Sequence, residues 1–294
     1  MVPLDKNFSY HFVQGECSNK ASWMYHRIFE DKRDIDIVFS GASHTGCAIM
    51  DEYISKELGK KSGTEVNVVN YGYCRGGRDI QYVMLKDLFS KKHPKVLVID
   101  VSEDEPKKSH PVFPYLAESK DLFGSFVLFN QRYFSAIWKG IVVRFESLKT
   151  KIWYGKVSLP TDLYSEYAYL SSSEVVSDKD LEQNRKAWKK RLSKNKLPLL
   201  RQLELNYSKH YLEKIVRLAS DNNCKVLFLY LPESGSHLGQ PLLMQYYRQY
   251  GDVIILPENI VQNKSNWKDA GHFNDTGARE TSGYIVSCLN KLLN

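Results

Sequence analysis

Residues 34–59 read DIDIVFSGASHTGCAIMDEYISKELG, and they contain the clearest indication of the fold class. Its first seven residues form a run rich in isoleucine and valine, which predicts a strand buried on both faces of a sheet. From residue 47 onward, apolar side chains recur at every third or fourth position, as on one face of an amphipathic helix. The small residues between the two segments predict a tight turn from strand to helix.

The strand-to-helix pattern repeats along the chain. Similar apolar runs predict further strands at 66–71, 95–101, 224–231 and 252–256, and helical spacing predicts helices at 78–92, 205–220 and 276–293. Strands that alternate with helices form parallel sheets covered on both faces. We therefore expect a three-layer α/β/α sandwich around a mostly parallel, flavodoxin-like sheet of about five strands.

The regular pattern is interrupted between residues 105 and 200, where aromatic and basic residues crowd together. We expect a single domain over residues 1–294, with residues 105–200 as an insertion or lid subdomain within it. The basic run at 184–196 fits a solvated helix face, and a polyanion or a membrane surface is the alternative reading. Peripheral contact with a membrane or a membrane partner through this basic, aromatic insertion is therefore a hypothesis.

Composition narrows the class of protein. The 294 residues are 43% hydrophobic, enough to bury a large core. The formal net charge of +7 is a mild excess, so no nucleic-acid partner is expected. No apolar stretch reaches the roughly 18 residues of a membrane-spanning helix, so we expect a soluble chain. If a signal or anchor preceded residue 1, the expected compartment is the bacterial periplasm or cell surface, and otherwise the cytoplasm.

Residues that directly follow the predicted strands are the candidates for a site, because the ligand crevice of such a sheet lies beyond the carboxyl ends of its strands. Ser43 follows the first strand, and Asp269 and His272 follow the fifth. A serine becomes nucleophilic beside a histidine base, and a carboxylate orients the imidazole and stabilises its charged form. The three residues form a candidate catalytic triad, although a serine at such a turn also fits a helix cap.

Backbone amides that could hold an oxyanion are predicted beside this serine. The Ser43 amide lies at the start of a helix, where the dipole favours negative charge. Gly72 follows the second strand, and a glycine leaves room for close approach of an N–H group, although an ordinary turn glycine is the alternative. Arg75 and Arg78 are candidate contacts for an anionic substrate group, with a solvent-facing helix start as the alternative.

The order of these residues resembles the SGNH/GDSL hydrolase superfamily. Its blocks are a G-D-S-like turn, a glycine, an asparagine in G-x-N-D, and D-x-x-H near the C-terminus. The string DAGHFNDTGA at 269–278 is similar to the D-x-x-H-x-N-x-x-G form common there. Over 34–104 and 205–294, the resemblance implies Ser43 as nucleophile, Gly72 as oxyanion donor, and Asp269 and His272 as the rest of the triad.

Two blocks depart from the family pattern. The first reads G-A-S-H, with Ala42 where many members carry aspartate. The third lacks G-x-N-D, and Ser102 stands where the oxyanion asparagine would be, followed by Glu103. Ser102 is therefore a tentative third donor, and loss of such a donor lowers turnover by about 100- to 1000-fold. The form G-[small]-S-[His/Arg] resembles the branch that modifies bacterial cell-surface polymers, and His44 is a further candidate substrate contact.

The leading hypothesis is a serine-dependent acyl-ester hydrolase or O-acyltransferase that acts on an acylated carbohydrate, a cell-surface glycan or another small ester. The alternative is a catalytically weak or inactive module of the same fold that binds an anionic glycan. Neither needs a cofactor, and the chain contains no G-x-G-x-x-G or G-x-x-x-x-G-K-[ST] motif. Its five cysteines form no C-x-x-C pair, so no metal site is expected.

Overall fold

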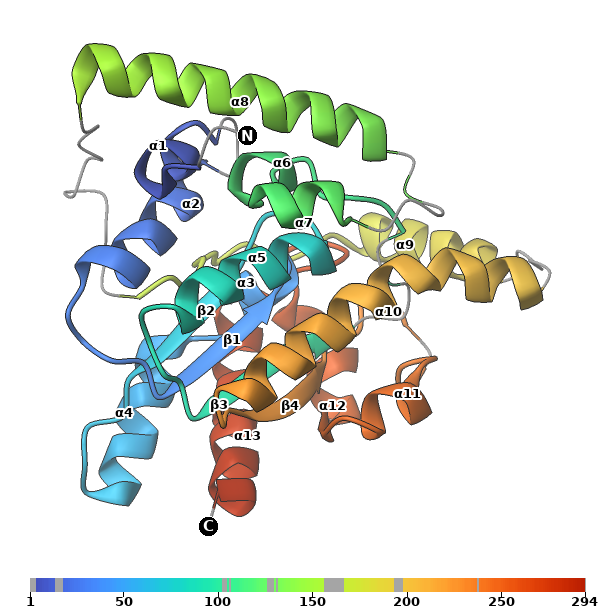
Figure 1. Cartoon of the computed structure of the whole chain (residues 1–294). Coiled ribbons are helices and arrows are strands. Elements are labelled where there is room, and N and C mark those ends of the chain that lie inside the picture. Colours follow the sequence, from blue (N-terminus) through green and yellow to red (C-terminus); the bar gives the residue numbers. More distant parts are fainter. Residues whose placement is uncertain are drawn as a thin grey trace.

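The computed structural model describes residues 4–13, 18–101, 105, 107–125, 130, 132–155, 167–192, 198–236 and 238–293. At its centre lies a wholly parallel five-stranded sheet with strand order β2-β1-β3-β4-β5 (Figure 1). The strands are β1 (Ile37–Gly41), β2 (Val68–Gly72), β3 (Val96–Val101), β4 (Lys225–Tyr230) and β5 (Asp252–Ile255). The predicted fold class is confirmed, and each strand begins at, or up to three residues after, the start of its apolar run.

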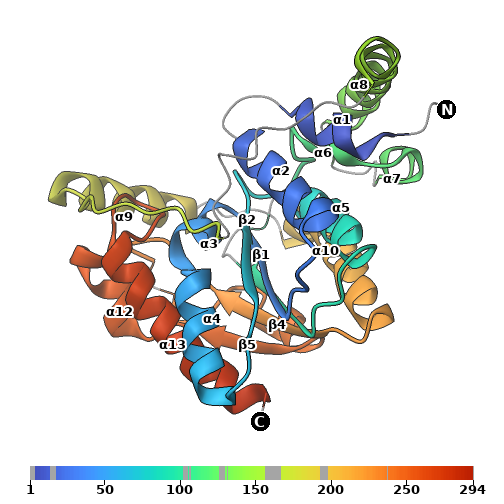
Figure 2. The same ribbon diagram turned by 90° about the vertical axis from the view of Figure 1, so that its left-hand side faces the viewer.

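Helices cover both faces of the sheet and bury two apolar clusters against it (Figure 2). One face carries α3 (Ser43–Ala48), α4 (Asp51–Ser62), α12 (Glu258–Gln262) and α13 (Asp275–Leu293), with a short 3-10 helix at Lys264–Asn266. The opposite face carries α1 (Lys6–His11), α2 (Ser18–Tyr25), a π-helical turn at His26–Glu30, α5 (Arg78–Phe89), α10 (Pro198–Asp221) and α11 (Met244–Arg248).

The helix expected from residue 47 is divided into two. Ile49 and Met50 adopt extended or irregular backbone angles between α3 and α4, so the helical pattern restarts at Asp51. Acidic residues in the first turn of α4 favour this start, because they complement the positive end of the helix dipole. The helix ends at Gly63, whose φ of 69° is left-handed and suits glycine. The result is a short separate helix, α3, that begins with Ser43.

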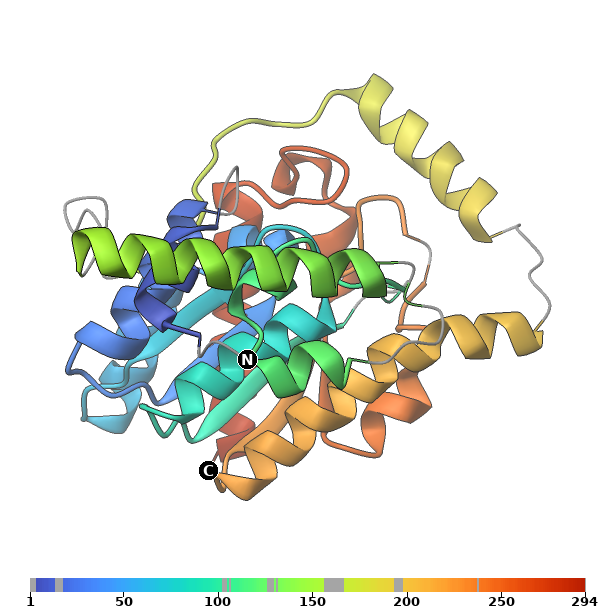
Figure 3. The ribbon, with the colours of Figure 1, turned by 45° about the horizontal axis from the view of Figure 1, so that its top comes forward.

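The described parts of the inserted region lie in two places. Helices α6 (Phe113–Leu116), α7 (Ser119–Phe123) and α8 (Tyr133–Tyr154) pack together with α1, and α8 is the outermost layer (Figure 3). The extended segment 167–177 and α9 (Asp178–Leu192) run instead along the side that carries α3 and α13 (Figure 2). Among the described residues, no helix combines the length and the hydropathy needed to cross a bilayer.

Candidate active site

Ser43 is presented at the carboxyl end of β1 by a turn that only glycine permits. A Cβ atom on Gly41 would lie 1.9 Å from Oγ1 of Thr45 and 2.7 Å from the Asp100 side chain. The missing side chain lets the chain turn directly from β1 into α3, whose first residue is Ser43. The Ser43 side chain therefore lies at the edge of the sheet, and its amide is among the first N–H groups of the helix, which lack intrahelical acceptors.

His272 lies opposite Ser43 in a loop that approaches from the far end of the chain. Its Nε2 atom is 2.8 Å from Oγ of Ser43, and its Nδ1 atom is 2.9 Å from Oδ1 of Asp269. The loop is closed by an isolated bridge between Trp267 and Phe273, whose rings stack with centroids 4.1 Å apart. The three side chains predicted to act together are thus within hydrogen-bond distance of one another.

The electrostatics around Asp269 favour its ionised form. Its Oδ1 atom accepts hydrogen bonds from the backbone N–H groups of Gly271, at 2.8 Å, and His272, at 2.9 Å. Partial burial opposes ionisation, but the hydrogen bonds from the His272 ring and from these amides outweigh it and lower the pKa of Asp269 to about 2. Asp269 is therefore a stable anionic partner for a positively charged imidazole.

The triad is accessible to water. The side chains of Asp269 and His272 are 48% and 26% exposed. His44 lies beside them, with its ring centroid 5.1 Å from that of His272. Burial, followed by the influence of His272, lowers the pKa of His44. The predicted substrate contact at His44 is thus a neutral imidazole adjoining the triad.

Asp100, at the end of β3, supports the serine turn, and the sequence analysis did not single it out. Its Oδ2 atom accepts the backbone N–H of Ala42 at 2.8 Å, directly before Ser43. Its Oδ1 atom accepts Nη1 of Arg78 at 3.1 Å. The available signal was a lone carboxylate in an otherwise apolar strand, VLVIDV. Through this contact, β3 sets the position of the nucleophile without touching it.

Arg78 does not line the crevice, which corrects the prediction that it contacts substrate. Its side chain is 3% exposed, and its guanidinium donates to Glu105, to Gln81 and to both the side chain and the carbonyl of Asp100. A buried arginine needs such partners to offset the loss of hydration. Its role is to hold Asp100 in place. Arg75 is exposed in the loop after β2, with a left-handed φ of 58°.

Gly72, the predicted oxyanion donor, has a packing role as well. Its amide donates to Oδ1 of Asn70 at 2.8 Å, so this N–H is already occupied. A Cβ atom on Gly72 would lie 2.2 Å from the backbone nitrogen of Gly46, so the missing side chain lets α3 pack directly on β2. The tentative donor Ser102 lies outside the described residues. The Ser43 amide is the one predicted oxyanion donor that the described part of the chain leaves without a competing acceptor.

A groove with both polar and apolar side chains in its lining adjoins the Asp269 side of the triad. It has a volume of about 720 Å³ and lies between segment 174–177, the first half of α9 and residues 268–270. Asn184 of α9 donates to the carbonyl oxygens of Ser234, at 2.7 Å, and Ala270, at 3.1 Å. The carboxylate, amide and ammonium groups that line the groove come from Glu174, Asp180, Gln183, Asn184, Lys268 and Asp269. Segments far apart in the sequence form the groove together, so no local sequence pattern predicted it.

The described part of the chain contains no cluster of three histidine, cysteine or acidic side chains that could hold a metal ion. Cys74 is disulfide-bonded, whereas Cys47, Cys224 and Cys288 are free. No protein-family model matches the chain, and no curated protein is similar enough to it to be identified as a relative.

Proposed function

We propose that this protein is a serine-dependent acyl-ester hydrolase of the SGNH/GDSL type. The observation that carries the proposal is the continuous relay from Oγ of Ser43 through the His272 ring to Asp269, with distances of 2.8 and 2.9 Å. A nucleophile hydrogen-bonded to a base, which is oriented in turn by a carboxylate, is the arrangement that acyl transfer through serine requires.

In the proposed reaction, Oγ of Ser43 attacks the ester carbonyl while Nε2 of His272 takes its proton. Asp269 stabilises the resulting imidazolium, and the Ser43 amide donates to the oxyanion. When the tetrahedral intermediate collapses, His272 gives its proton to the departing alcohol and leaves an acyl group on Ser43. Water then attacks the acyl-enzyme while His272 again acts as base, which releases the acid and restores the serine.

Two features guide the choice of acceptor and substrate. The exposed fractions of Asp269 and His272 leave the site open to water, which favours hydrolysis over transfer to an alcohol. The groove beside Asp269 carries carboxylates, amides and a lysine, groups that hydrogen-bond to a hydroxyl-rich molecule, alongside apolar side chains such as Val175 and Val176. An acylated carbohydrate is therefore the proposed natural substrate class, in line with the resemblance to enzymes of cell-surface polymers.

The test uses p-nitrophenyl acetate and an organophosphonate probe on the wild-type chain, on Ser43→Ala and on Ser119→Ala. Ser119 is the matched control, since it also opens a helix. We expect turnover to fall by about 10⁴-fold or more in Ser43→Ala alone. Mass spectrometry should find the label on Ser43. Equal turnover in all three proteins, or a label elsewhere, would reject the proposal.

The occupied Gly72 amide favours a second candidate, a glycan-binding module with weak or no catalysis, because an oxyanion site short of a donor is slow. If the wild type neither turns over esters nor accepts the probe, binding of an acidic polysaccharide to the wild type and to Ser43→Ala becomes the deciding measurement. Equal, salt-sensitive binding by both proteins supports the module. Release of acetate from an acetylated glycan by the wild type alone supports the esterase.

A further inference from the structure

Helix α8 exposes an apolar face to water. Of the twelve large hydrophobic side chains that are exposed in the described residues, eight belong to α8: Phe134, Trp138, Val142, Phe145, Leu148, Ile152, Trp153 and Tyr154. The first six recur at intervals of three or four residues and so form one stripe along the helix. Contiguous apolar patches of this kind mark interaction surfaces in folded proteins. We call these six side chains, together with Trp153 on the same side of the helix, the α8 stripe.

The stripe points outward because the opposite side of α8 is fastened to the protein. A Cβ atom on Gly140 would lie 2.3 Å from a methyl group of Leu122, so the helix packs closely there. Arg144 is buried and donates to the carbonyl oxygen of Ala117 at 2.7 Å. The buried residues of the protein-facing side are Ala136, Gly140, Val143, Arg144 and Ser147. The helix cannot turn its exposed apolar side inward without losing the contacts of these residues.

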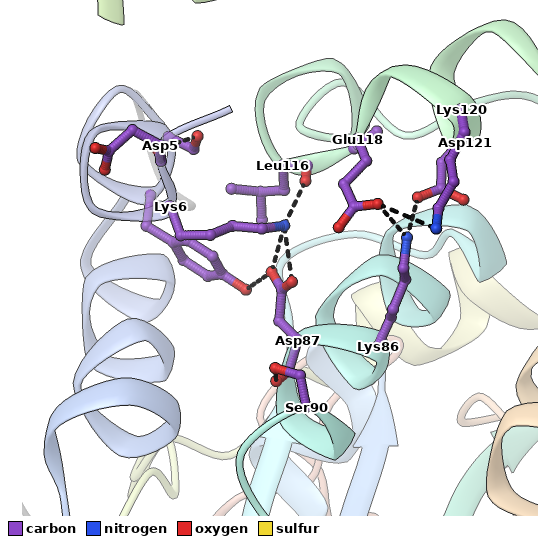
Figure 4. Close-up of polar contacts among 12 residues, drawn as sticks. Asp5, Lys6, Lys86, Asp87, Ser90, Leu116, Glu118, Lys120 and Asp121 are labelled. Atoms are coloured by element: carbon purple, nitrogen blue, oxygen red, sulfur yellow. Dashed lines mark hydrogen bonds and ion pairs between the residues drawn. The ribbon is translucent and has the colours of Figure 1, made fainter. Parts of the chain in front are cut away.

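The layer beneath α8 is itself anchored to α5 (Figure 4). Nζ of Lys6 in α1 contacts Oδ1 of the buried Asp87 at 2.7 Å and donates to the carbonyl oxygen of Leu116 at 3.1 Å. Lys86 donates to Glu118 and Asp121 at 2.7 and 2.6 Å, which holds α7. Buried or partly buried ion pairs therefore connect the helices that carry α8 to α5, which packs on the sheet. The stripe is a fixed surface of the fold.

The chemistry of the stripe fits a lipid surface. Tryptophan, which prefers the interface between lipid and water, supplies two of its members, Trp138 and Trp153. The exposed charged residues of α8 are three lysines (Lys139, Lys149 and Lys151) and one glutamate (Glu146). Lys151 is paired with Asp5, and the positive charge that remains after Asp5 and Glu146 are counted complements anionic phospholipid headgroups. A helix with an apolar aromatic face and adjoining lysines lies in the interface plane, with its apolar side in the headgroup region.

We propose that the α8 stripe docks this protein on the surface of an anionic phospholipid membrane. A second copy of the chain fits the stripe less well. Helix pairs that associate through such a stripe favour leucine, isoleucine or valine at the contacting positions. Val142, Leu148 and Ile152 would suit such a pair, but the bulky Phe134, Trp138 and Phe145 are interspersed with them along the stripe and would not. The proposal does not depend on the chemistry at Ser43. It adds a membrane-binding surface to the proposed enzymatic activity.

The test is flotation of the whole chain with vesicles of phosphatidylcholine alone or mixed with phosphatidylglycerol. In the stripe variant, Trp138, Phe145 and Ile152 become serine. Its matched control is the pair Val175→Ser and Leu242→Ser, which are exposed apolar residues away from α8. We expect the wild type and this control to float with the anionic vesicles, and the stripe variant to bind at least about 10-fold more weakly.

A second pair of variants tests the charge. Lys139→Gln with Lys149→Gln should weaken binding to anionic vesicles by about 20-fold, while Lys56→Gln with Lys60→Gln should not. Lys60, like Lys149, pairs with a glutamate three residues earlier, so the second pair is a matched control. Tryptophan emission should shift to shorter wavelength when anionic vesicles are added to the wild type, because Trp138 and Trp153 leave water.

Three results would overturn the proposal. The first is failure of the wild type to float with anionic vesicles, and the second is equal flotation of the wild type and the stripe variant. The third is a wild-type dimer in sedimentation velocity that the stripe variant abolishes, with no vesicle binding by either protein. That third result would assign the stripe to a second copy of the chain. Far-ultraviolet circular dichroism of the stripe variant, measured alongside, reports whether it is folded.

Discussion

The turn around Ser43 and the outer face of α8 depart in opposite directions from the usual distribution of side chains. Behind Ser43, a carboxylate and an arginine lie in the protein interior, and their charges are met by hydrogen bonds. On α8, aromatic and aliphatic side chains lie in water with few protein contacts. A buried ionic group and an exposed apolar face each cost stability unless they serve a purpose. The two regions are therefore where function is most expected.

The largest expected effect is on the relay at Ser43. Asp269→Asn removes the charge that stabilises the His272 imidazolium and favours the wrong tautomer, so turnover should fall by about 10³- to 10⁴-fold. Steady-state kinetics with p-nitrophenyl acetate measure the fall. Asp221→Asn, which removes an exposed carboxylate at the end of α10 outside the groove, is the control and should keep most of the activity. Similar losses in both variants would contradict a specific role for Asp269.

The next largest expected effect is on stability, and it compares a buried with an exposed aromatic side chain. Phe113 is fully buried, so Phe113→Ala should lower the free energy of unfolding by about 3 to 5 kcal/mol. Phe145 is 61% exposed, and Phe145→Ala should change it by no more than about 0.5 kcal/mol. Urea unfolding of the two variants compares them. A cost above 2 kcal/mol for Phe145→Ala would mean that the α8 stripe contributes to the core.

Substitution of Gly72 distinguishes a role in packing from a role in catalysis. Because a Cβ atom there would meet the backbone of Gly46, Gly72→Ala should destabilise the protein by about 1 to 3 kcal/mol. Gly239→Ala is the control, since a Cβ atom there meets nothing within 4 Å. Chemical denaturation gives both values. A Gly72→Ala protein of normal stability but a hundredfold lower turnover would return this residue to the oxyanion site.

A smaller effect on rate is expected from Asp100→Asn. The amide keeps one acceptor but loses the charge that Arg78 holds, so the Ser43 turn should be less well fixed. We expect kcat to fall by about 10-fold with KM nearly unchanged, and phosphonate labelling of Ser43 to slow in parallel. Asp36→Asn alters a carboxylate that accepts a backbone N–H at the opposite end of the sheet. Its kcat should stay near the wild-type value.

The smallest expected effect is on the pH dependence of stability. The pKa of Asp269 lies at about 2 in the folded protein and near 3.9 in an unfolded chain. Its contribution to stability is therefore present above about pH 4 and is lost as the pH falls toward 2. Because Asp269 is 48% exposed, the contribution should be under about 1 kcal/mol. The stability gap between wild type and Asp269→Asn should narrow from pH 6 to pH 2.5, and a constant gap would contradict the assignment.

Local periodicity was enough to identify the five strands, because residues in a parallel sheet are buried on both faces and their runs remain apolar whatever packs on them. The chain order of Ser43, Asp269 and His272 was likewise readable from the sequence. Each follows a predicted strand, and the carboxyl ends of parallel strands meet at one edge. The split between α3 and α4 was not readable, since the helical spacing continues through Ile49 and Met50.

The fold class, the strands and the three residues that the fold brings together could be predicted from local patterns, because each depends on a few neighbouring residues. Only the folded chain shows that the Gly72 amide donates to Asn70, that Arg78 is buried against Asp100, and that the α8 stripe faces water. Those facts depend on which distant residues come within contact. Helical spacing shows that a helix has an apolar side, but only the packing of its opposite side decides which way that side points.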